Sequence, residues 1–434
     1  MPAAYTPPTR LLNRSFVLLW QGQLVSSLGH QAFMVAMLYG TMELTGSGST
    51  MGLLMMLSSL PGLLFGPIGG AIADRYSRRA LIVGSDLLLG LGVLALAALA
   101  VGGTVDLLVP GLAVYALCLG LVSTVFQPAV MAAVPDLVPP HQIAAANSWR
   151  QVSTQATVAT GWALGGGLYA SLGMAWLLAL DGLSYLFSAA SESRIVLPRR
   201  TPADGSHRDA LAATLADTRA GLRYVWHHRG MRDFMLAVAA LNFFFMPVFV
   251  LLPFYTDGIL GAGAAGYGLL MASFSAGSLV GGLMAGIVQP TGASRRRWIL
   301  GGHTAMAILF GTLGLIDRLP LAAACFAALG FLVAVINIAS LTLLQTITPA
   351  DFRGRVLGVD TALTRAASPI GMGLAGILAD LTDQAIPQLF LAYGVAALGV
   401  ALVMCSHQAL RDFVGWDSSH PMLGTPTLNP RRSS

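Results

Sequence analysis

Long apolar runs, separated by short clusters of charged and turn-forming residues, dominate the chain and constrain its fold more than any other feature. Each run is close to the length of about 20 residues with which a helix crosses a bilayer. Twelve runs can be marked, at approximately 15–40, 50–73, 80–101, 107–132, 143–169, 172–193, 231–255, 266–289, 297–316, 320–347, 355–379 and 386–407. Because backbone polar groups in hydrocarbon must be paired within the segment and the runs do not alternate, they predict helices and exclude a β-barrel. The sequence therefore predicts an all-α membrane protein with twelve transmembrane helices.

The few charged residues predict the orientation of these helices. They make up 10% of the 434 residues, against about 25% in soluble domains. With the N-terminus inside, all basic residues except Arg318 fall in inner loops or near inner helix ends, as the positive-inside rule requires. We therefore expect a multi-pass protein of a bacterial inner membrane with both termini cytoplasmic, and no removable signal peptide.

All 24 basic residues are arginine, and lysine is absent from the chain. A phosphate-binding P-loop needs a lysine, and Schiff-base catalysis needs an amine side chain. The sequence G-A-G-A-A-G at 261–266 matches a dinucleotide-binding pattern, but it lies in an expected outer turn without a preceding strand. The chain is therefore not expected to hydrolyse ATP, and it carries no recognisable hydrolase or metalloprotease motif, so we expect no enzymatic activity.

A long polar interval divides the chain into two similar halves. The sequence Gly52-Leu-Leu-Met recurs 216 positions later as Gly268-Leu-Leu-Met. Two six-helix repeats are typical of transporters that bind their cargo between the halves near the midplane. The expected divisions are a cytoplasmic N-terminus at 1–14, a six-helix bundle at 15–193, a cytoplasmic linker at 194–230, a second six-helix bundle at 231–407 and a disordered cytoplasmic tail at 408–434.

The loop between the second and third runs carries the most specific motif. It contains Gly70, Asp74, Arg75, Arg78 and Arg79 in the spacing G-xxx-D-R-xx-R-R. This loop resembles the signature of the major facilitator superfamily, with Ser77 where that family usually has glycine. By this resemblance, Gly70 permits close helix contact, Asp74 pairs across to the neighbouring bundle, and the arginines hold the inner face near anionic headgroups.

Further motifs resemble one branch of that superfamily. The segments N-xx-F-xx-L-W-Q-G-Q at 13–23, F-Q-P-A at 126–129 and R-G-R-V at 353–356 are similar to the branch with the enterobactin exporter and the macrolide-efflux proteins. The resemblance covers the chain up to about residue 407 and implies secondary-active export of a bulky small molecule. Trp162 replaces the proline of the family's antiporter signature, so proton coupling does not follow from that motif.

Polar residues inside membrane helices are costly and indicate functional sites. Trp20, Gln23, Ser27 and His30 recur at helical spacing and share one stripe of the first run. His30 lies near the middle of this run and is a candidate for proton coupling, since its unperturbed pKa is near neutrality. A histidine that bonds two helices together would leave the same pattern.

Acidic residues inside the runs give a second proton-coupling candidate. Asp181 lies about seven residues from the outer end of its run and has no obvious partner. Asp86 lies within about two turns of the cytoplasmic surface and is expected to pair with loop arginines. The remaining cavity candidates are Gln127, Gln155, Asn242, Phe245, Phe249 and Asn337, of which the two phenylalanines belong to an aromatic, methionine-rich run suited to varied apolar ligands.

The sequence thus predicts a proton-coupled exporter of a hydrophobic or amphipathic small molecule, such as a drug or siderophore, that works by alternating access. A lipid or lysolipid flippase and a small-molecule importer have the same fold, and a membrane scaffold without transport is a third class. The expected partners are the small-molecule cargo, protons and the lipid bilayer. We expect a monomer that binds no nucleic acid and no cofactor. We also expect no metal site, because the three cysteines stand apart in apolar stretches.

Overall fold

The computed structural model describes residues 10–198, 207–288 and 290–416. Residues 1–9 of the expected N-terminal segment, residues 199–206 of the expected linker and residues 417–434 of the expected tail lie outside the described residues. The first part of the tail expected to be disordered, 408–434, instead forms helix α16 (Gln408–Val414), which buries Leu410, Phe413 and Val414.

The described chain consists of helices joined by short turns, with no strand in these residues. The first half contains α1 (Arg14–Thr45), α2 (Gly48–Arg75), α3 (Arg78–Val101), α4 (Val105–Leu137), the short 3₁₀ turn η1 (Pro140–Gln142), α5 (Ile143–Leu172) and α6 (Met174–Glu192). After α7 (His207–His227), the second half contains α8 (Arg229–Phe245), α9 (Val248–Phe254), η2 (Tyr255–Ile259), α10 (Gly263–Val288), α11 (Gly292–Arg296), η3 (Arg297–Gly301), α12 (Gly302–Thr312), η4 (Leu313–Leu315), α13 (Leu319–Ile347), α14 (Ala350–Leu381), α15 (Ile386–Ser406) and α16 (Gln408–Val414).

Ten helical segments in the described residues are long and apolar enough to span a membrane. Four precede α7, and six follow it, with α8, α9 and η2 forming one segment and α11 to η4 another. Two more long helices, α1 and α5, pack among the first four; they carry several of the polar residues described below. The predicted all-α membrane fold is therefore confirmed. Ten of the twelve expected spans are apolar enough to cross a membrane in the described residues, whereas α1 and α5 are more polar than ordinary membrane spans.

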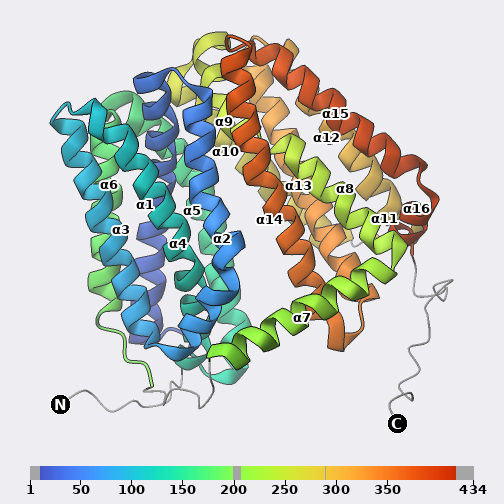
Figure 1. The fold of residues 1–434 in the computed structure, drawn as a ribbon, viewed down its shortest axis with the longest axis horizontal. Coiled ribbons are helices and arrows are strands. Elements are labelled where there is room, and N and C mark those ends of the chain that lie inside the picture. The colour runs from blue at the N-terminus through green and yellow to red at the C-terminus, as the bar shows by residue number, and fades with distance from the viewer. Residues whose placement is uncertain (1–9, 199–206, 289, 417–434) are drawn as a thin grey trace.

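The two halves meet at the end of the molecule away from α7, which we call the far end (Figure 1). There α2 packs along α14, and α5 packs along α10. A Cβ on Gly376 would lie 2.1 Å from the carbonyl oxygen of Gly48, and one on Gly166 would lie 2.7 Å from the Cα of Gly268. Only glycine allows backbones to approach so closely, so these residues let the halves close at the far end.

At the α7 end the ribbons of the two halves separate, and α7 crosses between them (Figure 1). A Cβ added to Gly62, Gly66 or Gly70 of α2 would meet no atom within 4 Å. The expected close helix contact at Gly70 is therefore wrong for this conformation. Helical rotation instead turns the neighbouring Gly69 onto α4, where a Cβ would lie 2.2 Å from the carbonyl oxygen of Thr124. The helices of the two halves pack closely at the far end, and their backbones lie farther apart at the α7 end (Figure 1).

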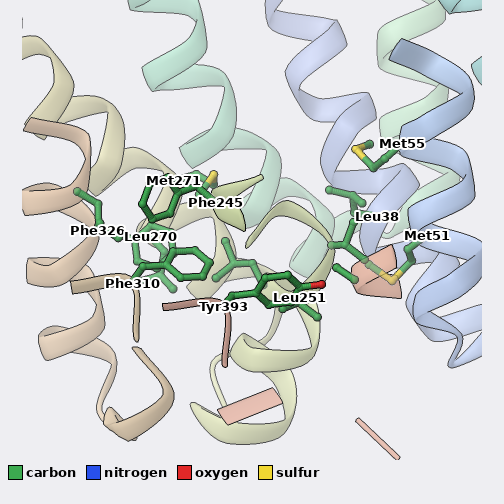
Figure 2. Packing of buried hydrophobic residues seen from close by; sticks show 14 of the residues in the cluster. Leu38, Met51, Met55, Phe245, Leu251, Leu270, Met271, Phe310, Phe326 and Tyr393 are labelled. Atoms are coloured by element: carbon green, nitrogen blue, oxygen red, sulfur yellow. The ribbon is translucent and has the colours of Figure 1, made fainter. Parts of the chain in front are cut away.

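A large apolar core cluster extends through both halves. Figure 2 shows Phe245, Met271 and Phe310 in the second half, together with Leu38 and Met51 of α1 and α2. The rings of Phe245 and Phe310 pack edge to face with centroids 5.5 Å apart, an arrangement that adds about 0.5–1.5 kcal/mol to the burial of their area.

Candidate transport cavity

A cavity of about 310 Å³ lies among the six helices of the first half. Polar groups from α1, α3, α4 and α5 face apolar side chains across it. The lining includes Gln23, Ser26, Ser27, His30, Gln31, Met34, Ser58, Asp86, Leu119, Ser123, Phe126, Gln127, Thr154, Thr157 and Tyr185. A mixed lining of this kind suits an amphipathic ligand, because apolar walls supply affinity and the polar groups fix its orientation.

The structure brings four of the sequence-predicted residues together in this lining: Gln23, Ser27, His30 and Gln127. Trp20 lies on the same helix outside the lining. Its indole N–H donates a hydrogen bond to the Ser153 hydroxyl at 2.7 Å, and its ring packs edge to face on Trp149 with centroids 5.8 Å apart. Trp20 therefore joins α1 to α5.

His30 occupies the wall of the cavity with one ring nitrogen unpaired. Its Nδ1 is shielded from solvent and has no hydrogen-bond partner among the described residues, and its ring stacks on Phe33 with centroids 6.1 Å apart. An imidazole nitrogen without a protein partner is available to a proton, a water molecule or a ligand.

The carboxyl group of Asp86 also lines the cavity, and this position corrects the expected pairing with loop arginines. Asp86 is fully buried, and neither of its carboxyl oxygens has a hydrogen-bond partner in the described part of the chain. The loop arginine Arg78 instead pairs with Asp136. The expectation failed because α3 turns Asp86 toward α6 and the cavity.

Asp181 lies on α6, where it faces α1 and not the cavity. It is fully buried, and a Cβ on Gly29 of α1 would lie 2.8 Å from its Oδ1. The Ser184 hydroxyl approaches that oxygen at 3.5 Å, while Oδ2 has no partner among the described residues. The predicted lack of a partner for Asp181 holds for this oxygen.

The other predicted polar cavity residues do not line the 310 Å³ cavity of the first half. Gln155 of α5 and Asn337 of α13 are exposed and do not line the 310 Å³ cavity. Asn242 donates its side-chain amide to the Val238 carbonyl oxygen of its own helix at 3.0 Å. The sequence shows that these residues are polar, but it does not show which face of each helix meets the other half.

Phe245 and Phe249 do not form the expected aromatic pocket. Phe245 is 8% exposed and packs on Phe310 in the core of the second half (Figure 2), and Phe249 packs against the same core cluster. The pocket interpretation was wrong for Phe245, because α8 buries this residue among its neighbouring helices.

The predicted gating loop joins α2 and α3 at the α7 end. The Arg78 guanidinium contacts a carboxyl oxygen of Asp136 on α4 at 2.5 Å, with both side chains largely buried, and it donates a hydrogen bond to the Ala132 carbonyl oxygen. Arg79 donates to the carbonyl oxygen of Ser193 after α6. These contacts tie helices of one half together. The side chain of Asp74 lies outside the described residues, and Arg75 is the last residue of α2.

The far end is closed by contacts that the sequence did not indicate. The Asp380 carboxylate accepts hydrogen bonds from the Gly48 and Ser49 backbone amides at 2.6 and 3.0 Å. Tyr39 of α1 hydrogen-bonds to Thr256 of η2, and its ring lies 5.7 Å from that of Tyr267. Both sets join the two halves.

A second cavity of about 370 Å³ lies in the second half, between α10, α13 and the segment after α16. Its lining includes Arg295, Trp298 and Trp416, and none of the predicted site residues. Arg295 is largely buried and donates to the Val414 carbonyl oxygen at 3.2 Å, so it anchors the end of the described chain. In the described residues no group of three histidine, cysteine or carboxylate side chains is arranged to hold a metal ion.

The amino-acid sequence matches a known protein family. Residues 4–428 match the model of the transmembrane secretion effector family of the major facilitator superfamily. The multidrug efflux pump Tap of Mycolicibacterium fortuitum is 29% identical over 88% of this chain and 93% of its own. Macrolide efflux protein A of Streptococcus pyogenes is 24% identical over 89% of this chain and 94% of its own.

Solved structures agree on the fold. A bacterial homologue of the iron transporter ferroportin, in an inward-facing state, superposes with a TM-score of 0.71 at 17% identity, covering 91% of this chain and all of the other. The fold of this chain is thus that of secondary transporters. The chain is a multi-pass membrane protein and belongs to the transmembrane secretion effector family of the major facilitator superfamily.

Proposed function

We propose that this protein exports hydrophobic or amphipathic small molecules, macrolides among them, in exchange for protons. The observation that carries the proposal is the cavity in the first half, where His30, Gln23 and Gln127 face the apolar side chains of Met34 and Phe126. Its two kinds of lining match cargo with an apolar body and a few polar groups. The names of the relatives, a macrolide efflux protein and a multidrug efflux pump, support this class of cargo.

The α7 end faces the cytoplasm in this proposal. The arginines of the α2–α3 turn, of α7, of α11 and of the start of α14 gather at this end, whereas Arg318 lies in a turn at the far end. Basic residues concentrate on the cytoplasmic side of membrane proteins, so the observed conformation is open to the cytoplasm. We place the monomer in the bacterial inner membrane with both termini inside.

Cargo enters from the cytoplasm, and the two halves then rock so that the α7 end closes and the far end opens. His30 and Asp181 are the proposed proton-coupling groups, with His30 in the cavity wall and Asp181 in the adjoining helix interface. One charge that crosses a potential of 100 mV contributes about 2.3 kcal/mol, enough to bias a two-state equilibrium by almost two orders of magnitude.

Transport by purified protein in proteoliposomes tests the proposal. We expect a macrolide such as erythromycin and a cationic dye to accumulate in vesicles that hold an acidic lumen and expose the α7 end outward, and a protonophore to abolish the accumulation. No gradient-driven movement of either compound, with movement of a fluorescent lysolipid in the same vesicles, would replace the exporter by the flippase alternative. Accumulation in vesicles that have the α7 end facing the lumen and an acidic exterior would indicate an importer, and movement of none of these compounds would leave the scaffold class.

A further inference from the structure

A buried polar seam runs through the first half where α1, α3 and α6 meet. We define it by Asp86 of α3 and by Asp181, Ser184, Ser188 and Glu192 of α6, all of which are buried, the three acidic residues and Ser188 completely. Side chains at these spacings on α6 share one face of the helix. Helices α3 and α6 pack on one another and α1 packs on α6, so the seam lies inside the bundle.

Two glycines of α1 make room for the seam. A Cβ on Gly29 would lie 2.1 Å from the Ser184 hydroxyl oxygen, and a Cβ on Gly22 would lie 3.0 Å from the Ser188 hydroxyl and 3.3 Å from Oε1 of Glu192. Any larger residue at Gly29 would displace the side chains of α6. The backbone of α1 therefore admits polar groups at positions where an ordinary membrane helix pair would place apolar side chains.

Five polar atoms in the seam make no hydrogen bond of ordinary geometry within the described residues: both carboxyl oxygens of Asp86, Oδ2 of Asp181, Oε2 of Glu192 and the hydroxyl of Ser188. Asp86, Ser188 and Glu192 nevertheless lie close enough to interact with one another. The Gln23 amide donates to Oε1 of Glu192 at 2.7 Å. A buried carboxylate without a cation or several donors is destabilised by several kcal/mol, and two adjacent carboxyl groups resist joint ionisation.

The charged and titratable groups around the seam do not supply the missing partners. Tyr185 of α6, Tyr115 of α4 and His30 of α1 face Asp86 or Asp181 from the neighbouring helices. Arg79, beside Glu192 in the lining of a small gap, donates to the Ser193 carbonyl oxygen. The ion pairs of the described chain include none with Asp86, Asp181 or Glu192.

The seam reaches the cavity at Asp86. Gln23, His30, Asp86 and Tyr185 all line the 310 Å³ cavity, and Asp86 lies beside Ser188 and Glu192 of α6. Glu192 is the last residue of α6 at the α7 end. One carboxyl group of the seam thus lies in the cavity wall, with its oxygens shielded from solvent in this conformation, and the others continue from it along α6.

We propose that Asp86, Glu192 and Asp181 carry the transported protons, with Asp86 as the point of exchange with cavity water and Ser188 as a hydrogen-bonding bridge. The inference rests on the proposed proton-coupled transport and adds two residues to it. A proton from cavity water forms an O–H bond with a carboxylate oxygen of Asp86. It is passed within the seam, and the same kind of bond breaks when the proton returns to water at the cytoplasmic side.

Charge-removing variants test the seam. Asp86→Asn and Glu192→Gln keep the size and polarity of each side chain but bind no transferable proton, and Asp106→Asn, an exposed acid at the start of α4, is the matched control. In proteoliposomes we expect each seam variant to lower the ratio of pH-driven accumulation to gradient-free cargo exchange at least tenfold, and Asp106→Asn to leave it at the wild-type value. Wild-type ratios in both seam variants would overturn the inference, as would accumulation driven by a sodium gradient at constant pH.

Infrared difference spectroscopy tests the seam without cargo. Wild-type protein titrated from high to low pH is expected to show C=O stretching bands of protonated buried carboxyl groups, and Asp86→Asn and Glu192→Gln are each expected to remove part of this signal. An unchanged spectrum in both variants would contradict proton binding by the seam, even if transport is observed. If the seam bands are present but the protein moves no cargo, the seam binds protons and the proposed export function is rejected.

Discussion

The Asp380 carboxylate accepts the backbone N–H of Gly48 at 2.6 Å, which joins the last turns of α14 to the first turn of α2 across the boundary between the two halves. The same carboxylate also accepts from the hydroxyls of Ser47 and Ser49 at 2.9 and 2.5 Å. A negative charge at a helix N-terminus is stabilised by the unpaired amides there. Asp380 therefore holds the far end closed.

We expect Asp380→Asn to open the far end. A hydrogen bond to a charged group contributes about 1.5–3 kcal/mol, and a difference of 1.4 kcal/mol is a tenfold change in an equilibrium. Spin labels at Thr104 and Asp317, both exposed in far-end turns of opposite halves, report the distance between the halves. In Asp380→Asn the fraction of molecules with the longer distance between the labels should rise at least tenfold. Asp383→Asn, in the neighbouring turn, is the control, and equal distance distributions for the two variants would argue against the role of Asp380.

Gly166 of α5 gives a second test of far-end closure. A Cβ at this position would lie 2.5 Å from the Ala264 carbonyl oxygen of α10, whereas a Cβ on the adjacent Gly167 would meet no atom within 4 Å. Gly166→Ala is expected to disfavour the closed far end by about 1–3 kcal/mol and to slow cargo exchange at least tenfold. Gly167→Ala should exchange cargo at the wild-type rate. Equal rates in both variants would show that α5 and α10 need not approach so closely.

Phe245 should affect stability more than cargo range. Removal of a buried phenylalanine ring costs about 3–5 kcal/mol, and Phe245 is buried against Phe310. Phe245→Ala is expected to lower the thermal unfolding temperature clearly and to leave the relative rates for different cargoes unchanged. Phe65→Ala, at an exposed position on α2, is the control. A stable Phe245→Ala protein with an altered cargo range would restore the aromatic-pocket interpretation.

Ser27 tests the cavity as the place where cargo binds. The small side chain of Ser27 lines the 310 Å³ cavity, so a phenylalanine there would fill part of its volume and displace a ligand. Ser27→Phe is expected to raise the dissociation constant for a macrolide at least tenfold in a fluorescence binding assay. Ser171→Phe, exposed near the end of α5, should bind as the wild type does. Unchanged binding by Ser27→Phe would move the cargo site to another part of the protein.

Much of the fold could be predicted from the sequence because membrane helices follow directly from long apolar runs. The polar stripe of α1 was also predictable, since Gln23, Ser27 and His30 share a helical face and lie together in the cavity lining. Glu192 was missed because it ends an apolar run and looks like an interfacial residue. Its burial depends on Gly22 of α1, a contact between residues far apart in the sequence.

The errors have the same physical origin. The apolar runs show which residues lie in the membrane but not which face of each helix meets a neighbour. Phe245 was therefore assigned to a pocket and lies in the core, and Asp86 was assigned to loop arginines and lies against α6. The Asp380 contact with α2 depends on how the two halves meet in this conformation, which sequence periodicity does not contain.

The proposed exchange of protons for cargo at the first-half cavity can be measured as the release of protons when cargo binds. Detergent-solubilised protein in weak buffer is mixed with a macrolide at saturating concentration, and the pH change is recorded with an indicator dye. We expect the wild type to release protons, Asp86→Asn to release few or none, and macrolide binding to weaken as the pH falls, since the two ligands compete. Macrolide binding that releases no protons and has the same affinity at every pH would contradict the proposed exchange.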